Sequence, residues 1–220
     1  MNLTKFTHSC VRLERDGRVL VLDPGNFSEV EEALRGAHAV LITHEHPDHI
    51  DRERVLAQLR DNQALQLYAP AKLAAEMRAT AGESGGAGRI HEVEVNSTFT
   101  AAGFSVQSFG SQHALIHPLI PIVANLGYLI DGKVFHPGDS FTVPHGVHVP
   151  TLLVPINAPY SKVAEVIDFV IACGSERAYP IHDALLNPAG LELVEGHVTR
   201  IGQLYGTVYK HLAPGDSVQL

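Results

Sequence analysis

Histidines and acids are crowded into one short stretch of the chain, THEHPDHI at residues 43–50. Four of its side chains are of the types that bind zinc and similar ions: His44, His46, Asp48 and His49. Pro47 cannot lie inside a helix without removing a hydrogen bond, so a helical metal motif is excluded. In an extended segment His44 and His46 would share one face, and a turn after Pro47 would present the other two side chains from a different direction. The spacing therefore predicts one loop that offers two ligands to each of two ions.

Four side chains of one loop cannot surround two ions, so partners from elsewhere in the chain are required. Polar residues stand at or after the ends of three apolar, strand-like runs: His113 in SQHALIHP, Asp139 in HPGDS and His182 in PIHD. Side chains at such ends converge at one edge of a sheet. A lone histidine or aspartate there would otherwise be an ordinary surface, core or turn residue. Imidazole and carboxylate together favour zinc, manganese or iron over calcium or magnesium.

The chain that must position these residues alternates between strands and helices. Period-two and apolar runs predict strands at 3–8, 9–15, 18–23, 37–43, 65–70, 91–95, 103–109, 125–130, 133–139, 151–156 and 176–182. Helices are predicted at 28–36, 51–60, 71–80, 161–174 and about 189–206.

Turn and cap residues support these boundaries. Asp16-Gly17 and Asp131-Gly132 are typical of tight hairpin turns, and Ser28 and Gly36 are expected to bound the first helix. Gly174 is expected to end the fourth helix, and GESGGAG at 82–88 predicts a surface loop. Two β-rich halves with interspersed helices predict an α/β protein in which two packed sheets carry helices on the outside.

The composition is that of one globular domain spanning residues 1–220. The net charge is −8 and no basic run occurs, which disfavours nucleic acid as a partner. No apolar run reaches the length of a membrane span and MNLTKFTHSC lacks the features of a secretory signal, so the expected location is cytoplasmic. Cys10 and Cys173 form no C-x-x-C pair, and their apolar surroundings predict buried free thiols.

The T-H-x-H-x-D-H stretch resembles the most specific motif of the metallo-β-lactamase fold superfamily of metal-dependent hydrolases. The remaining motifs, at His113, Gly138-Asp139 and His182, follow in the family's order, so the resemblance covers essentially the whole chain. It implies a four-layer αββα sandwich. Carried over residue by residue, it implies a first ion held by His44, His46 and His113, a second held by Asp48, His49 and His182, and Asp139 bridging both. Asp23 in VLDPG matches an acid that orients a motif histidine, since a ligand imidazole needs its other nitrogen fixed.

The N-terminal THSCVRLE resembles a narrower branch, which includes ascorbate-6-phosphate lactonase-like proteins and related phosphodiesterases. In that branch a histidine of the first hairpin lies beside the metal centre. His8 is the match, although Thr7 stands where a smaller residue is more usual. The chain also lacks the long insertion that nucleic-acid-processing members carry between Asp139 and His182. The resemblance thus implies a compact hydrolase of small molecules.

The same resemblance implies two divalent ions, with zinc expected and manganese or iron as alternatives. A metal-bound hydroxide would attack an ester, lactone or phosphodiester. Asp48 is expected to orient the nucleophile, and His8 or His117 to protonate the leaving group. His145 and Tyr160 are expected beside the substrate pocket, with purely structural loop roles as the alternative.

Two other functions stay open at this point. One is a nuclease or nucleotide phosphodiesterase, and the other is a non-catalytic metal-binding protein on the same scaffold. The expected partner is a small-molecule substrate, without nucleic acid or membrane. The apolar stretch LIHPLIPIV is a candidate interface for a homo-oligomer.

Overall fold

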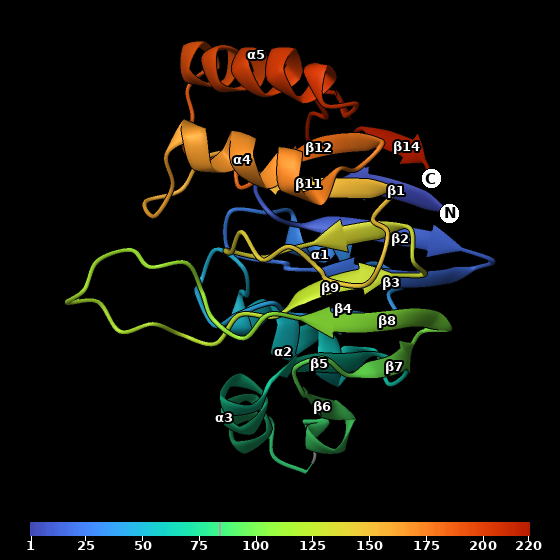
Figure 1. Cartoon of the computed structure of the whole chain (residues 1–220). Coiled ribbons are helices and arrows are strands. Elements are labelled where there is room, and N and C mark those ends of the chain that lie inside the picture. The colour runs from blue at the N-terminus through green and yellow to red at the C-terminus, as the bar shows by residue number, and fades with distance from the viewer. Residues whose placement is uncertain (84) are drawn as a thin grey trace.

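The computed structural model describes residues 1–83 and 85–220. Two seven-stranded sheets pack together, and helices lie on their outer sides (Figure 1). This arrangement confirms the predicted αββα sandwich.

The first sheet comes from the N-terminal half of the chain and one late strand. Its strand order is β14 (Ser217–Gln219), β1 (Asn2–Lys5), β2 (Val11–Arg15), β3 (Arg18–Leu22), β4 (Ala39–Leu41), β5 (Gln66–Pro70) and β6 (Ile90–Val93). The strands from β14 to β3 are antiparallel, and those from β3 to β6 are parallel. Parallel neighbours need crossover connections, which contain α1 (Val30–Ala33), α2 (Arg52–Asp61) and α3 (Ala71–Ala81).

The second sheet repeats this plan. Its order is β13 (Val208–Tyr209), β12 (Arg177–Ile181), β11 (Thr151–Pro155), β10 (Val134–His136), β9 (Gly127–Ile130), β8 (Phe104–Phe109) and β7 (Thr98–Ala101). An antiparallel part, β7 to β10, continues into a parallel part, β10 to β13, whose crossovers contain α4 (Val163–Cys173) and α5 (Pro188–Leu204). The carboxyl ends of the parallel strands are therefore the places where loops can meet, as in other open α/β sheets.

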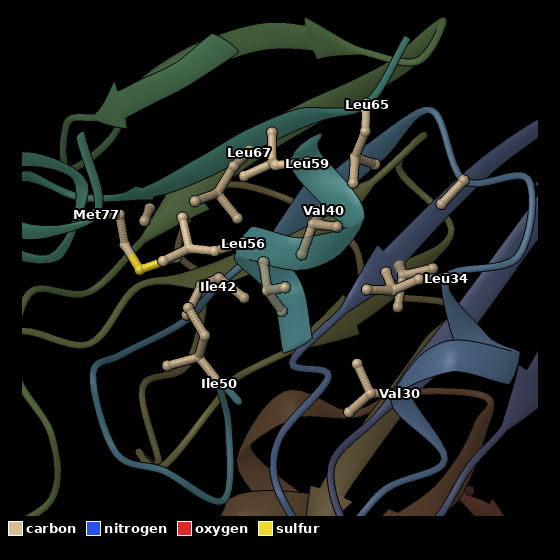
Figure 2. Packing of buried hydrophobic residues seen from close by; sticks show 14 of the residues in the cluster. Val30, Leu34, Val40, Ile42, Ile50, Leu56, Leu59, Leu65, Leu67 and Met77 are labelled. Carbon is tan, nitrogen blue, oxygen red and sulfur yellow. The ribbon is translucent and has the colours of Figure 1, made fainter. Parts of the chain in front are cut away.

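Three clusters of buried apolar side chains hold the four layers together. The central cluster lies between the sheets and includes Leu13, Leu20 and Tyr128. Figure 2 shows the cluster between the first sheet and its helices, in which Leu56 and Leu59 of α2 pack near Val40 of β4 and near Ile42, which follows β4. A third cluster joins α4 and α5 to the second sheet. Each fully buried aliphatic side chain in such a layer stabilises the fold by roughly 1.5–3 kcal/mol.

Most predicted element boundaries agree with the structure to within a few residues. Both hairpin turns have two residues with positive φ, as the Asp-Gly pairs predict, and Gly174 ends α4 in a left-handed conformation. The prediction for 28–36 was too long. Ser28 does not cap α1, because its hydroxyl donates to the Gly25 carbonyl oxygen instead, and the helix ends before Gly36.

Three short strands, β7, β13 and β14, were not predicted from the sequence. Within the predicted loop 82–88, residue 84 lies outside the described residues, and a short 3-10 helix begins at Ala87. The segment between β8 and β9 extends away from the sheets, where Leu119 is 86% exposed (Figure 1). Among the helices that the structure describes, none combines the length and the apolar character that crossing a membrane requires.

Candidate metal centre

Loops from both sheets meet at the carboxyl ends of the parallel strands. The THEHPDHI loop follows β4, and the loop carrying Asp139 follows β10. Asp23 directly follows β3, and His182 directly follows β12. Because the two halves of the fold share one plan, these strand ends face each other across the sandwich.

The loop after β3 holds the THEHPDHI loop by backbone contacts. The amide of Asn26 donates to the Pro47 carbonyl oxygen at 2.8 Å, and the amide of Asp51 donates to the Pro24 carbonyl oxygen at 3.0 Å. A side-chain carbon at Gly25 would lie 1.8 Å from the Asp48 carbonyl oxygen. Only glycine therefore allows this approach of the two backbones.

Four buried histidines have their Nδ1 atoms fixed by oxygen acceptors. The pairs are His44 with Thr43 Oγ1 (3.0 Å), His49 with Asp23 Oδ2 (2.7 Å), His113 with the Ala114 carbonyl (2.6 Å) and His182 with the Asn157 carbonyl (2.5 Å). The Thr43 hydroxyl donates its own proton to Asp23, so it accepts from His44. In the neutral form of each ring Nδ1 therefore carries the proton, and Nε2 is left with its lone pair.

These Nε2 atoms converge on the Asp139 carboxylate, and that of His44 also lies 3.1 Å from His46 Nδ1. The distances to the nearer oxygen of Asp139 are 3.0 Å from His49, 3.1 Å from His182, 3.3 Å from His113 and 4.0 Å from His44. Among the described residues, His49 Nε2, His113 Nε2 and Asp139 Oδ1 are buried and have no hydrogen-bond partner. Lone pairs that face one another in a buried site are unfavourable unless a cation lies between them. The donor set thus fits divalent metal ions.

The side chains form two groups, in each of which the candidate ligand atoms lie within 4.8 Å of one another. The first group consists of His44, His46, His113 and Asp139. The second group consists of His8, Asp48, His49 and His182. The structure therefore brings together all seven residues predicted as ligands, divides the THEHPDHI loop between the groups, and adds His8 to the second.

The pKa values in the site follow from burial and from the carboxylates. Burial lowers the pKa of His44 well below its usual value and lowers that of His46 as well. Burial also acts to lower the pKa of His49, but the carboxylates of Asp139 and Asp23 raise it well above the usual value. For Asp139 burial acts upward, yet the adjacent His49 holds the pKa well below its usual range. Metal ions bind to ionised carboxylates and neutral imidazoles, and most of these side chains are in that form.

His8 lies between Asp48 and the loop after β12. Its Nε2 atom is 3.2 Å from Asp48 Oδ2, and its Nδ1 atom accepts from the Ala184 amide at 3.4 Å. Burial raises the pKa of the Asp48 carboxyl, but the His8 contact and the charge of His49 lower it to about 2. The ring of Phe27 packs edge-on against His8, with 5.2 Å between the ring centroids.

Three non-glycine residues of the site have positive φ: His8, Asp23 and His182. A positive φ at a non-glycine residue costs roughly 1–3 kcal/mol, so the surrounding fold must stabilise the backbone at these positions. The amide of His182 donates to the His8 carbonyl oxygen at 3.2 Å, which joins two of these strained positions. Strain of this kind clusters at functional sites.

Two residues that support the site were not predicted from the sequence. Asn125 accepts from the Asp139 amide at 3.0 Å and donates to the Pro137 carbonyl oxygen at 2.9 Å. His136 is fully buried, donates from Nε2 to the Ser9 carbonyl oxygen at 2.9 Å and accepts from the Gly138 amide at 3.1 Å. The contact of His136 with Ser9 and those of Asn125 join residues that are apart in sequence, so no local motif predicts either residue.

The remaining predicted residues divide into one inside the site and two outside it. Tyr160 lies beside the first group, with its ring centroid 5.2 Å from that of His113. His117 is exposed and accepts from the Leu119 amide at 3.1 Å, within its own loop. His145 is exposed and lines a separate shallow depression with Gln107. The structure thus does not bring His117 or His145 to the metal groups, because their loops turn outward.

Comparison with known proteins shows to which family the chain belongs. A sequence model described as the β-lactamase superfamily domain matches residues 2–182. The chain belongs to the β-lactamase superfamily. This confirms the predicted superfamily of metal-dependent hydrolases, while the narrower lactonase-like branch stays a prediction.

Several known proteins are similar to most of this chain. Protein Rv0786c of Mycobacterium tuberculosis is 39% identical over 206 residues, which are 91% of this chain and 92% of that protein. The UPF0173 metal-dependent hydrolase of Xanthobacter autotrophicus is 30% identical over 155 residues, which are 64% and 62% of the two chains. The solved structure of Igni18, a metallo hydrolase from Ignicoccus hospitalis, has a TM-score of 0.73 at 19% identity and covers 99% of this chain and 97% of its own. At that identity the likeness supports the fold alone.

Proposed function

We propose that the protein hydrolyses a small-molecule ester or lactone with two divalent metal ions, zinc first among the candidates. The observation that carries this proposal is the convergence of four Nε2 atoms on the buried Asp139 carboxylate. His44, His46 and His113 would hold one ion, Asp48, His49 and His182 the other, and Asp139 would bridge them. When bound, such ions activate a water molecule at neutral pH and polarise a carbonyl or phosphoryl oxygen.

The protein's own residues then have separate tasks. Asp48 stays ionised, because its pKa is about 2, and can accept a hydrogen bond from the attacking water. His8 accepts from the Ala184 amide at Nδ1, so its Nε2 proton points to Asp48 and fixes that carboxylate. We assign His8 to positioning Asp48, rather than to protonating the leaving group, because one nitrogen atom cannot do both in this geometry.

The charges around the site favour an uncharged substrate. Acidic side chains are frequent in the loops that carry the ligands, among them Glu29, Glu45 and Asp51, of which Glu45 pairs with Lys72 and Asp51 with Arg54. The nearby cation Lys5 is buried and paired with Asp183, with 2.9 Å between Nζ and Oδ2. A nuclease needs free lysines and arginines to bind several phosphates. The setting therefore supports a neutral ester or lactone above a nucleic acid or a phosphorylated compound.

Metal content per chain is the first test, on protein purified without chelators. We expect about two ions per chain in the native protein and a sharp loss in Asp139→Ala. Asp168→Ala changes an exposed aspartate of α4 and is the matched control. If no metal is bound or taken up on adding zinc or manganese, the proposed function is wrong.

Activity is the second test, with nitrophenyl esters, simple lactones and bis(nitrophenyl) phosphate. We expect turnover of an ester or lactone that disappears with chelator and returns with metal. Turnover of the phosphate diester alone would favour the phosphodiesterase. Two bound ions without turnover of any of these would favour the non-catalytic scaffold.

A further inference from the structure

The hydroxyl of Tyr160 is a buried polar group outside the two groups of candidate ligands. Its oxygen atom is inaccessible to solvent and has no hydrogen-bond partner among the described residues. Its ring lies near two candidate ligands, with centroid distances of 5.2 Å to His113 and 6.2 Å to His182. A buried hydroxyl without a partner costs roughly 1–3 kcal/mol. Such a cost is removed when a ligand accepts the missing hydrogen bond.

A tight turn fixes the place of this side chain. The Ser161 amide donates to the Ala158 carbonyl oxygen at 3.0 Å, and the Ala158 amide donates to Ser161 Oγ at 3.1 Å. Tyr160 stands inside that turn, directly after Pro159, whose ring restricts the backbone. The tyrosine ring also packs against Phe141 at 5.8 Å, and Phe141 packs against Phe169 of α4 at 5.4 Å. The hydroxyl is therefore held in place before any ligand arrives.

The Asp139 carboxylate lies close enough to interact with this hydroxyl. Even so, the geometry of that approach leaves the Tyr160 oxygen without a hydrogen-bond partner among the described residues. The hydroxyl proton is therefore free to turn toward a bound ligand.

We propose that the Tyr160 hydroxyl donates a hydrogen bond to the substrate oxygen that gains negative charge as the carbonyl is attacked. The inference rests on the proposed function and names a catalytic residue for it. A fixed donor in a buried site stabilises that charge without having to reorganise. Removing one such donor typically lowers kcat by 10²–10³-fold, so an effect of about 10²-fold is expected here. No proton needs to leave the tyrosine for this role.

The test compares Tyr160→Phe with the native protein, and Tyr205→Phe, which changes an exposed tyrosine after α5, is the control. We expect Tyr160→Phe to bind as much metal as the native protein and to lose about 10²-fold in kcat with little change in KM. Tyr205→Phe should behave as the native protein. Equal kcat in Tyr160→Phe and the native protein would overturn the inference. A loss of metal in Tyr160→Phe would also overturn it, because the hydroxyl would then act through Asp139.

A binding measurement keeps this test independent of finding a substrate. Methylphosphonate is a tetrahedral anion whose oxygen atoms imitate the attacked carbonyl centre. We expect its affinity for the zinc-loaded protein, measured by calorimetry, to fall about tenfold in Tyr160→Phe and to be unchanged in Tyr205→Phe. Equal affinities in all three proteins would overturn the inference even if ester hydrolysis is observed. A tenfold loss without any hydrolysis would support the hydroxyl as an oxygen-binding group while the proposed function fails.

Discussion

Asp23 Oδ2 accepts a hydrogen bond from His49 Nδ1 at 2.7 Å, and both side chains are fully buried. The same carboxylate accepts from the amide and the hydroxyl of Thr43 at 2.8 and 2.6 Å. All of its contacts are thus with donors, and they fix the direction in which His49 presents its Nε2 atom. An acid in this place controls a candidate ligand without touching the ion.

Asp23→Asn should weaken metal binding. The amide would bring two N–H donors into a place where Asp23 meets only donors, so at least one contact with Thr43 or His49 would become repulsive. Loss of such an orienting partner typically costs 10–100-fold in metal affinity, measured here by competition with a chelator. Asp168→Asn, on the exposed side of α4, should leave the affinity unchanged. Equal affinities of Asp23→Asn and the native protein would show that His49 does not depend on this carboxylate.

His136→Ala should destabilise the fold. The ring joins the Ser9 carbonyl oxygen to the Gly138 amide, and its removal leaves two buried backbone groups unpaired. We expect the free energy of unfolding in urea to fall by about 3 kcal/mol, from roughly 1–3 kcal/mol for each group. His145→Ala changes an exposed histidine and should alter stability by less than about 0.5 kcal/mol. A similar, small effect of both substitutions would contradict the structural role assigned to His136.

Lys5→Met should be more harmful than removing the whole ion pair. Lys5 is 1% exposed and lies 2.9 Å from Asp183, the residue after His182. Removing the cation leaves a nearly buried carboxylate and should cost about 3–5 kcal/mol in chemical denaturation. The double variant Lys5→Met, Asp183→Leu should recover most of that loss. Lys133→Met, in an exposed hairpin turn, is the control, and additive single effects would disprove the coupling.

Both thiols should react slowly in the folded protein. Burial raises the pKa of Cys173 from 9.0 to about 12, and it raises that of the fully buried Cys10 further. Only the thiolate is nucleophilic, so alkylation of Cys173 by iodoacetamide at pH 8 should be about a thousandfold slower than in urea-unfolded protein. Mass spectrometry over time measures both rates. Equal rates would mean that the partly buried Cys173 thiol is freely accessible in solution.

The raised pKa of Cys173 also predicts a loss of stability in alkali. The unfolded chain releases the thiol proton near pH 9, and the folded chain releases it near pH 12. The contribution of the protonated thiol to the free energy of unfolding is therefore complete below pH 9 and is lost as the pH rises toward 12. Cys173→Ala should show a weaker decline in the free energy of unfolding over this range. If the free energy of unfolding falls equally in Cys173→Ala and the native protein, groups other than Cys173 cause the pH dependence.

The sequence predicts the site better than it predicts the residues around it. THEHPDHI is local, and its proline and spacing are enough to divide the loop between two groups of ligands. The Nε2 contact of His136 depends on Ser9 in the turn between β1 and β2 of the opposite sheet, and no local pattern reveals it. His117 and His145 were expected at the site because they are near it in sequence. The direction of an irregular loop depends on its packing, and these two loops turn outward.

The errors in the fold have similar causes. Serine often caps a helix, but the Ser28 hydroxyl donates to the Gly25 carbonyl oxygen in a turn and so does not cap α1. The strands β13 and β14 are two and three residues long, too short to show a period of their own. They exist because β12 and β1 offer unpaired edges to them. Longer apolar runs such as TLLVPI were predicted correctly, because burial on both faces leaves a continuous signal.

The two ligand groups are completed at different points of the chain, which has a consequence for protein synthesis. The first group needs nothing beyond Asp139, whereas the second waits for His182. The ribosome therefore adds the last residue of the first group to the chain well before it adds the last residue of the second. A nascent chain could capture one ion while the other half-built group still lacks its final histidine. The supply of metal during translation, and not only after it, would then influence which ion each group retains.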